Sequence, residues 1–171
     1  PAYRADDALW LFPTIYKYIA ETGNIAFLDE VIPYANNGEA TVYQHLQAAI
    51  KFSLDHLGPH GMPAGLYADW NDCLRLGAQG ESSFVALQFY YALKILKDFA
   101  SYKQDDDYLA FLKKIKADIE QKIQDLCWDN DRFIRGFTEK GELIGESRAP
   151  EANFWLNPQS WAVISGLASK H

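Results

Sequence analysis

"ESSFVALQFYYALKILKDFASYK", residues 81–103, is the stretch that decides the fold class. Apolar residues recur in it at helical spacing, and neither glycine nor proline interrupts it, which predicts a long, strongly amphipathic helix. Glu81 and Ser82 stand where this helix begins, so we expect them to cap it or to brace the loop that precedes it.

Two further helices are expected before this stretch. "DDALWLFPTIYKYIAETGN", residues 6–24, has a cap candidate in Asp6 and a glycine stop in Gly23. Pro13 within it marks either a kink or a later true start. "TVYQHLQAAIKFSLDHLG", residues 41–58, runs to a second glycine stop at its last position.

Two more helices are expected after it. "DDDYLAFLKKIKADIEQKIQDLCW", residues 105–128, repeats the pattern behind an acidic first turn. "NPQSWAVISGLASKH", residues 157–171, opens with Asn157 as cap and Pro158 at the first helical position. Between these helices, residues 132–145 predict one short β-hairpin, in which "RFIRGF" and "ELIG" pair around "EKG".

We therefore predict an all-α chain in which long helices follow one another, with Asp- and Trp-rich connections at several of their ends. Stacked helical hairpins of this kind form either a solenoid or a closed toroid. No linker rich in Ser, Gly or Pro divides residues 1–171, so we expect a single unit. Because both ends are abrupt, we expect this unit to be a segment of a longer protein.

Composition argues against several kinds of partner. The formal net charge is −7, whereas nucleic acids and anionic membrane surfaces require basic patches. No apolar run approaches membrane-spanning length, and the start lacks the features of a signal peptide. The two cysteines, Cys73 and Cys127, are far apart and lack CxxC spacing. This spacing argues against a disulfide framework and against a zinc site, and it favours a reducing, cytoplasmic compartment.

"GLYADWNDCLRLGAQGES", residues 65–82, interrupts the helices with an unusual mixture of polar residues. Asp69 and Asp72 are three positions apart, so we expect both carboxylates to face one cavity. Cleavage of a glycosidic bond needs a protonated carboxylic acid, polar groups for the sugar hydroxyls and an aromatic ring that stacks on the pyranose. The loop supplies all three. The alternative is that Asp69 or Asn71 caps a short turn while Trp70 fills the core.

The segment "ADWNDCL", followed by "GES" and a long helix, resembles the active-site segment of family 94 glycoside hydrolases, the inverting disaccharide phosphorylases. "WDNDRFIRGFTEKGELIGES" and "LNPQSWAVISGLAS" are similar to segments that follow in that family, and "ADDALWL" is similar to one that precedes. The likeness runs in order from about residue 5 to the end of the chain, and the WND motif is its most specific part.

The resemblance implies a fold, a reaction and two site residues. The fold is an (α/α)6 barrel, of which this chain would hold the acid-bearing half. Asp72 matches the general acid, which protonates the glycosidic oxygen while inorganic phosphate attacks the anomeric carbon from the opposite face. Trp70 matches the tryptophan that lies against the sugar on the non-reducing side of the cleaved bond.

The substrates implied by the resemblance are inorganic phosphate and a β-linked disaccharide, cellobiose or N,N'-diacetylchitobiose, which would yield an α-sugar 1-phosphate. No metal and no cofactor are expected, and a homodimeric parent enzyme is compatible with the family. Family members also carry sugar-binding residues upstream and a phosphate-binding segment downstream that this chain does not match. We therefore expect little or no activity from the isolated chain.

Several roles stay open. Asp69 either orients the loop or binds a hydroxyl group, and Asp6 and Asp7 either point into the same cleft or start a helix. His60 has no recognisable partner, and Cys73 is expected to be a small buried residue. An inverting hydrolase on the same fold would need a catalytic base, for which no carboxylate has a clear claim. A carbohydrate-binding or purely structural helical segment is the third interpretation.

Overall fold

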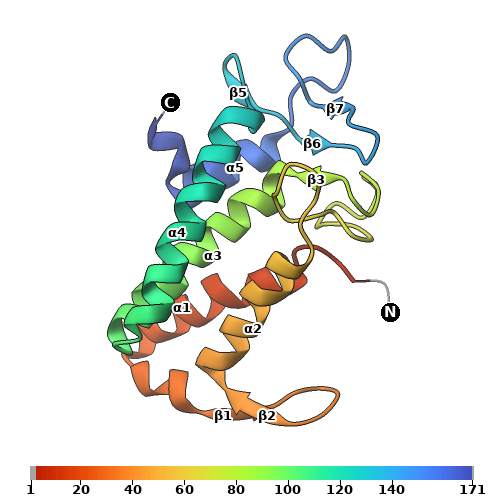
Figure 1. Ribbon diagram of the computed structural model, residues 1–171. Helices are drawn as coiled ribbons and strands as arrows, with labels where there is room; N and C mark the ends of the chain where they lie inside the picture. The colour runs from red at the N-terminus through yellow and green to blue at the C-terminus, as the bar shows by residue number, and fades with distance from the viewer. Residues whose placement is uncertain (1–2, 171) are drawn as a thin grey trace.

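The computed structural model describes residues 3–170 and is predominantly helical, with the helices gathered around one long central helix (Figure 1). Residues 1, 2 and 171 of the predicted unit lie outside the described part. One element, η3, is a π-helix, and the other η elements are 3-10 helices. In chain order the elements are η1 (Asp7–Trp10), α1 (Leu11–Thr22), η2 (Ile25–Asp29), β1 (Val31–Pro33), β2 (Glu39–Thr41), α2 (Val42–Asp55), β3 (Glu81–Ser82), α3 (Ser83–Tyr102), α4 (Asp106–Lys122), η3 (Ile123–Cys127), β4 (Trp128–Asp129), β5 (Arg132–Phe133), β6 (Gly136–Phe137), β7 (Leu143–Ile144), α5 (Leu156–Ser165) and η4 (Leu167–Lys170).

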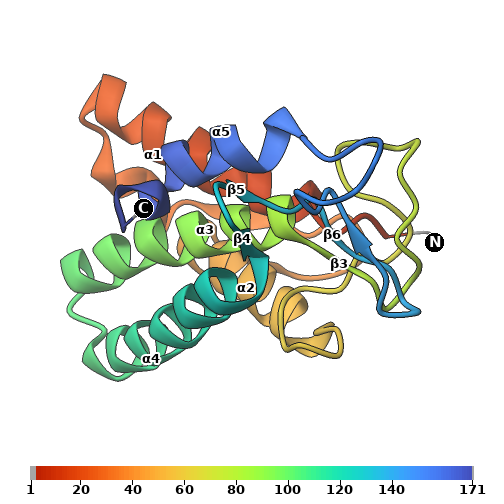
Figure 2. The ribbon, with the colours of Figure 1, turned by 90° about the horizontal axis from the view of Figure 1, so that it is seen from above.

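The hydrophobic core forms around α3. Helices α1, α2, α4 and α5 all pack against it, and Figure 2 shows α3 running between α4 and α5. Apolar side chains such as Leu87, Phe89 and Leu93 are completely buried, and each contributes roughly 1.5–3 kcal/mol. The first half of α3 is buried on every side, so the predicted amphipathic pattern holds only for its second half. In the described part of the chain, no helix is long and apolar enough to cross a membrane.

The start of α1 differs from the simplest expectation. The helix begins at Leu11, so Pro13 stands in its first turn and marks a late start rather than a kink. Gly23 ends the helix in the left-handed conformation with φ 68°, as predicted. Asp6 does not cap a helix, because its Oδ2 accepts a hydrogen bond from Trp10 Nε1 at 2.9 Å instead.

Helix α2 starts as predicted and stops early. Thr41 and Gln44 form a capping box, in which Gln44 N donates to Thr41 Oγ1 at 3.2 Å. The helix is capped at His56, so the predicted stop at Gly58 is wrong. Gly58 has a different reason to be glycine, because a Cβ there would overlap the side chain of Glu81.

The last two helices begin in different ways. Helix α4 starts behind the expected acidic turn, where Asp105 accepts a hydrogen bond from Tyr108 N at 3.3 Å. Helix α5 starts at Leu156, so the prediction that Asn157 caps it is wrong, and Pro158 occupies its first turn but not its first position. Proline is tolerated there because backbone N–H groups of the first turn have no partner within the helix.

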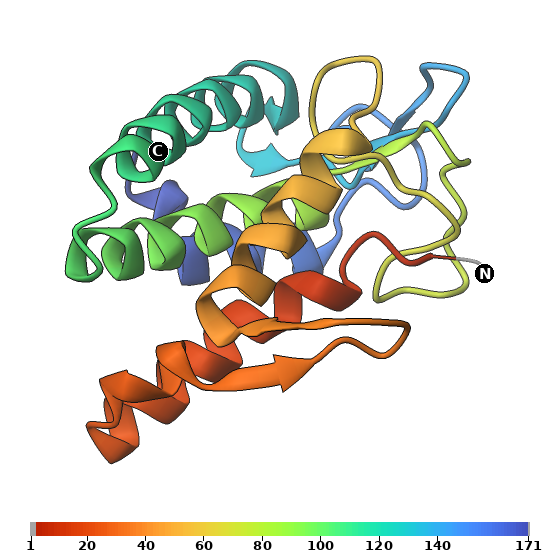
Figure 3. The same ribbon diagram turned by 60° about the horizontal axis from the view of Figure 1, so that its bottom comes forward.

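Short strands form three small sheets, so the all-α prediction is incomplete. The predicted hairpin is confirmed for its inner part, since β6 and β7 pair antiparallel with Gly136 opposite Ile144, whereas Arg132 and Phe133 form β5 and pair elsewhere. Strand β6 also pairs with β3, and β4 pairs with β5. Figure 3 shows the paired strands β3, β6 and β7 and the loop before α3 gathered at one end of the helices, apart from the β1–β2 hairpin.

Gly136 is the tightest point between β6 and β3. Its φ is 153°, and a Cβ there would overlap the backbone oxygen of Glu81. We expect Gly136→Ala to lower the free energy of unfolding by about 3 kcal/mol, because it combines backbone strain with a clash against backbone atoms. Chemical denaturation of the purified protein measures this loss.

Gly141→Ala, in the turn of the same hairpin, is the matched control. Its φ is 83°, but a Cβ there meets nothing within 4 Å. Only backbone strain is added, so we expect a loss of about 1 kcal/mol. Equal losses for the two variants would contradict the clash at Gly136.

Candidate active site

The loop of residues 65–82, hereafter the WND loop, is attached to the start of the described chain. Ala5 N donates a hydrogen bond to Ala68 O at 2.9 Å, and Tyr67 N donates to Tyr3 O at 3.0 Å. These bonds give the loop an extended partner on one side. The loop therefore has a defined backbone although it contains no helix.

Two side chains shape the turn at the centre of the WND loop. Asp69 Oδ1 accepts a hydrogen bond from Asn71 N at 2.9 Å, and Asn71 Oδ1 accepts one from Cys73 N at 3.2 Å. Side chains of Asp and Asn stabilise turns in this way. The capping alternative is therefore correct for the backbone of the turn. Cys73 is exposed, so the prediction that it is buried is wrong.

Asp69 is also half of a buried ion pair with Arg135, a residue to which the sequence assigned no role. Arg135 Nη2 donates to Asp69 Oδ1 at 2.8 Å and to Oδ2 at 2.6 Å. Ser82 Oγ donates to Asp69 Oδ2 at 2.7 Å and accepts from Arg135 Nη1 at 2.6 Å. Ser82 also caps α3, because its Oγ accepts from Val85 N at 3.3 Å. The three side chains tie the WND loop to the central helix.

The carboxylates of Asp69 and Asp72 do not face one cavity, contrary to expectation. Asp69 is buried against Arg135, whereas Asp72 forms an ion pair with Arg4. The side chains of Asp72 and Arg4 are 60% and 37% exposed. Each carboxylate has its own guanidinium partner, and this separates them.

A cavity of about 380 Å³ lies beside the loop, a volume suited to a small ligand. Trp70 is 63% exposed, so it does not fill the core, and the packing alternative for this residue is wrong. Trp155 and Trp161 line the same cavity and were missed, because a tryptophan within or next to an apolar helix is expected in a core. The lining residues are Trp70, Asn71, Arg135, Trp155, Leu156, Asn157, Ser160 and Trp161.

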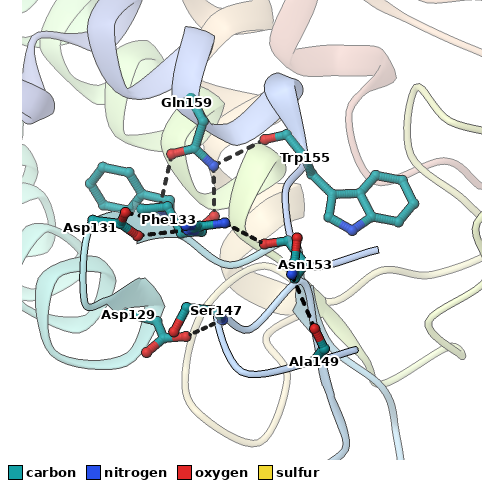
Figure 4. Close-up of polar contacts among 9 residues, drawn as sticks. Asp129, Asp131, Phe133, Ser147, Ala149, Asn153, Trp155 and Gln159 are labelled. Carbon is teal, nitrogen blue, oxygen red and sulfur yellow. Dashed lines mark hydrogen bonds and ion pairs between the residues drawn. The ribbon is translucent and has the colours of Figure 1, made fainter. Parts of the chain in front are cut away.

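The segment that carries Trp155 is bound to β5 (Figure 4). Gln159 Nε2 donates to Trp155 O at 3.0 Å and to Phe133 O at 2.7 Å, and Phe133 N donates to Gln159 Oε1 at 2.9 Å. Arg132 Nη1 donates to Asn153 O at 3.2 Å. The side chains of Gln159 and Arg132 thus hold this wall of the cavity against one short strand.

Glu81 braces the segment between α2 and the WND loop, which confirms the predicted loop-bracing role. It is fully buried, and its Oε1 accepts hydrogen bonds from His60 N at 3.1 Å and Met62 N at 3.0 Å. Its Oε2 pairs with His60 Nδ1. His60 therefore has a partner that the sequence did not indicate.

Asp6 stands at the N-cap position of η1 and does not line the cavity. It is 2% exposed, and its Oδ1 has no hydrogen-bond partner within residues 3–170. Burial raises the pKa of Asp6, the hydrogen bond from Trp10 acts in the opposite direction, and the charge of Asp69 raises it further. The Trp10 ring meets Trp161 edge-on with centroids 5.4 Å apart. Asp7 is exposed and begins η1.

A larger cavity of about 530 Å³ lies between α2 and α4, lined mainly by apolar side chains such as Ile50, Leu54 and Phe111. It shares no residue with the WND loop, so the smaller cavity is the better candidate site. Within residues 3–170, no group of three or more His, Cys, Asp and Glu side chains could hold a metal ion.

A cavity walled by indole rings beside a carboxylate-rich loop suits a sugar, whose flat faces stack on aromatic rings. The chain belongs to the glycosyl hydrolase 94 superfamily, whose catalytic-domain model matches residues 2–171. This confirms the family recognised from the WND segment.

Three relatives illustrate the family. N,N'-diacetylchitobiose phosphorylases of Vibrio proteolyticus and Vibrio furnissii are 42% and 41% identical to the chain, each over 97% of its length. Solabiose phosphorylase of Paenibacillus borealis is 34% identical over 98% of the chain. The chain spans 21%, 21% and 22% of the length of these three proteins.

The Glu81 carboxylate can be tested by Glu81→Gln. The amide keeps the shape but removes the charge and places an N–H group where backbone N–H groups converge. We expect the free energy of unfolding to fall by about 3 kcal/mol, the order of a lost charge-assisted hydrogen bond with a donor left unsatisfied. Chemical denaturation measures it. Glu21→Gln, at an exposed position of α1, removes the same charge and is expected to have almost no effect.

Asp6 predicts a pH dependence of stability. Its pKa in the folded state lies above the usual value of 3.8, so the folded state binds the proton more tightly than the unfolded state. Wild-type stability contributed by this group therefore falls as pH rises from about 3.8 through the raised pKa. We expect Asp6→Asn to be more stable than wild type at pH 7, with the difference vanishing below pH 3.8. Urea denaturation across this pH range measures the difference in stability between Asp6→Asn and wild type, with Asp107→Asn at an exposed position as the control. A difference that does not change with pH would contradict the assigned role of Asp6.

Proposed function

We propose that this chain is the acid-bearing segment of an inverting disaccharide phosphorylase, in which Asp72 is the general acid and Trp70 the sugar platform. The observation that carries the proposal is the position of Trp70, an exposed indole that lines the cavity two residues before Asp72. Membership of the superfamily supports the chemistry, and the phosphorylase names of the three relatives support the use of phosphate.

The reaction follows from this pair of residues. Asp72 donates its proton to the glycosidic oxygen, and phosphate attacks the anomeric carbon from the opposite face. The bond from that carbon to the glycosidic oxygen breaks as the bond to phosphate forms, which inverts the configuration and gives an α-sugar 1-phosphate. Phosphate replaces the activated water of an inverting hydrolase, so no second carboxylate, metal or other cofactor is required.

Arg4 must release Asp72 before catalysis. A neighbouring cation favours the ionised form of a carboxyl group, whereas a general acid must carry its proton. The pair is largely exposed, so it is worth about 1 kcal/mol or less and can open when a substrate binds. The ion pair is therefore a resting arrangement of the acid.

For the substrate we propose a β-linked disaccharide, cellobiose or N,N'-diacetylchitobiose, and the relatives at 42% and 41% identity favour the latter. We further propose that residues 1–171 are one unit and contribute to an (α/α)6 barrel, a proposal that the successive helices around α3 support. A cytoplasmic location is proposed from the two unpaired cysteines.

The test uses the full-length protein that contains this chain. We expect phosphate-dependent release of a sugar 1-phosphate from a β-linked disaccharide, and a loss on the order of 10²–10⁴-fold in kcat for Asp72→Asn. Exposed Asp107→Asn is the control and should retain full activity. Product release without phosphate would indicate a hydrolase, and no turnover of any disaccharide would favour a binding or structural role. Full activity of Asp72→Asn would exclude the assigned acid.

A further inference from the structure

Arg135 is the largest fully buried polar side chain of the described structure, with 1% exposure, and it lies between the two walls of the cavity. Its guanidinium binds Asp69, the residue directly before Trp70, through both carboxylate oxygens. On the other side, Arg135 Cζ lies 5.8 Å from the centroid of the Trp155 ring. One cation thus contacts the WND loop and the opposite indole wall.

The backbone of Arg135 is fixed as firmly as its side chain. Arg135 N donates to Ile144 O at 2.7 Å, and Arg135 O accepts from Ser83 N at 3.1 Å. Gly145, with φ 84°, lets Trp155 approach, because a Cβ there would lie 2.8 Å from Trp155 Cδ1 and 2.9 Å from Arg135 N. The guanidinium therefore extends from a rigid position toward both walls.

Stability alone does not account for this cation. Removing a charged group from water costs several kcal/mol, and a buried ion pair is often no more stable than apolar residues of similar size. The distinctive property of arginine is its planar fork of donors in fixed directions: here Nη2 binds both carboxylate oxygens while Nη1 donates to Ser82 Oγ, so the orientation of the carboxylate is fixed relative to the start of α3. Here the oriented carboxylate is Asp69, which itself holds the turn through Asn71 N at 2.9 Å.

We propose that Arg135 is a positioning residue that holds the turn of residues 69–72 against the Trp155 wall and thereby fixes where Asp72 delivers its proton. The proposal rests on the proposed function, because it assumes that Asp72 is the general acid. Arg135 acts through Asp69 and takes no part in the bond changes. Its loss should therefore impair the step that needs a proton more than the binding of the reacting ring.

The experiment compares two substrates of the full-length protein that share one sugar. The first is the natural disaccharide, whose leaving group must be protonated. The second is the 2,4-dinitrophenyl β-glycoside, whose phenolate leaves without a proton. For Arg135→Met we expect kcat on the disaccharide to fall on the order of 10²-fold, the effect of a misplacement of about 1 Å, and kcat on the aryl glycoside to fall less than about tenfold.

Three reference variants make the comparison sharp. Arg135→Lys keeps the positive charge but not the fork, so we expect an intermediate loss with the same preference for the activated substrate. Asp72→Asn should show the same preference more strongly, because it removes the proton itself. Arg148→Met, at an exposed position after β7, should leave both rates unchanged. Circular dichroism and thermal unfolding establish which variants are folded.

The outcomes separate this proposal from the proposed function. Folded Arg135 variants that lose both activities equally, or lose neither, would overturn the positioning role. If neither Arg135→Met nor Arg135→Lys folds, the residue serves stability and the proposal is also overturned. If Asp72→Asn shows no preference between the two substrates, the assignment of the acid fails instead. If the full-length protein hydrolyses the disaccharide without phosphate, the proposed phosphorylase activity is wrong. The comparison between the disaccharide and the aryl glycoside still tests the role of Arg135 in that case.

Discussion

The buried contact between Arg135 and Asp69 determines how the irregular part of this protein is joined to its helices. Asp69 begins the WND turn, Ser82 caps α3, and the guanidinium binds both side chains. A loop without regular structure has few backbone hydrogen bonds of its own to keep it in place. Charge-assisted bonds between buried side chains supply the missing constraint, and they do so at the point where the loop meets the helix that organises the core.

The same aromatic side chain serves the core and the cavity. Trp161 packs against Phe84 of α3 with ring centroids 5.4 Å apart and is only 8% exposed, yet it lines the cavity beside Trp70. A wall that is also part of a close-packed interior cannot shift without disturbing that interior. Trp70, in contrast, stands on a turn whose backbone is held by the side chains of Asp69 and Asn71. The cavity therefore has one rigid side and one side whose geometry depends on a few hydrogen bonds.

The sequence predicted the elements that depend on local pattern. Helical periodicity indicated all five long helices, and the "EKG" turn indicated the β6–β7 hairpin. Ends that depend on tertiary packing were wrong: Gly58 is glycine because Glu81 lies against it, not because a helix stops there. Strands of two or three residues, such as β1 and β3, contain too little alternation to be recognised.

The candidate site could be predicted only where one short segment carries the information. The WND motif indicated the loop, but Arg135 is 66 residues from Asp69, and nothing in either local sequence marks the pair. Trp155 was missed for a similar reason, since its place at the cavity depends on Gln159 and Phe133. A charged residue between Ile134 and Gly136, inside a segment expected to form a strand, is a signal that could have raised the question.

The glycines beside Arg135 have a consequence for how this region can change. Gly136 lets the backbone of β6 approach β3 at the end of the WND loop, so the loop and the β6–β7 hairpin form one interlocked surface, and Gly145 lets the end of the hairpin approach Trp155. A loop transplanted alone from a relative would meet a hairpin shaped for a different neighbour. Residues 65–82 and 136–145 are therefore expected to behave as a single module, so that a change in one segment requires a matching change in the other and both must be transplanted together.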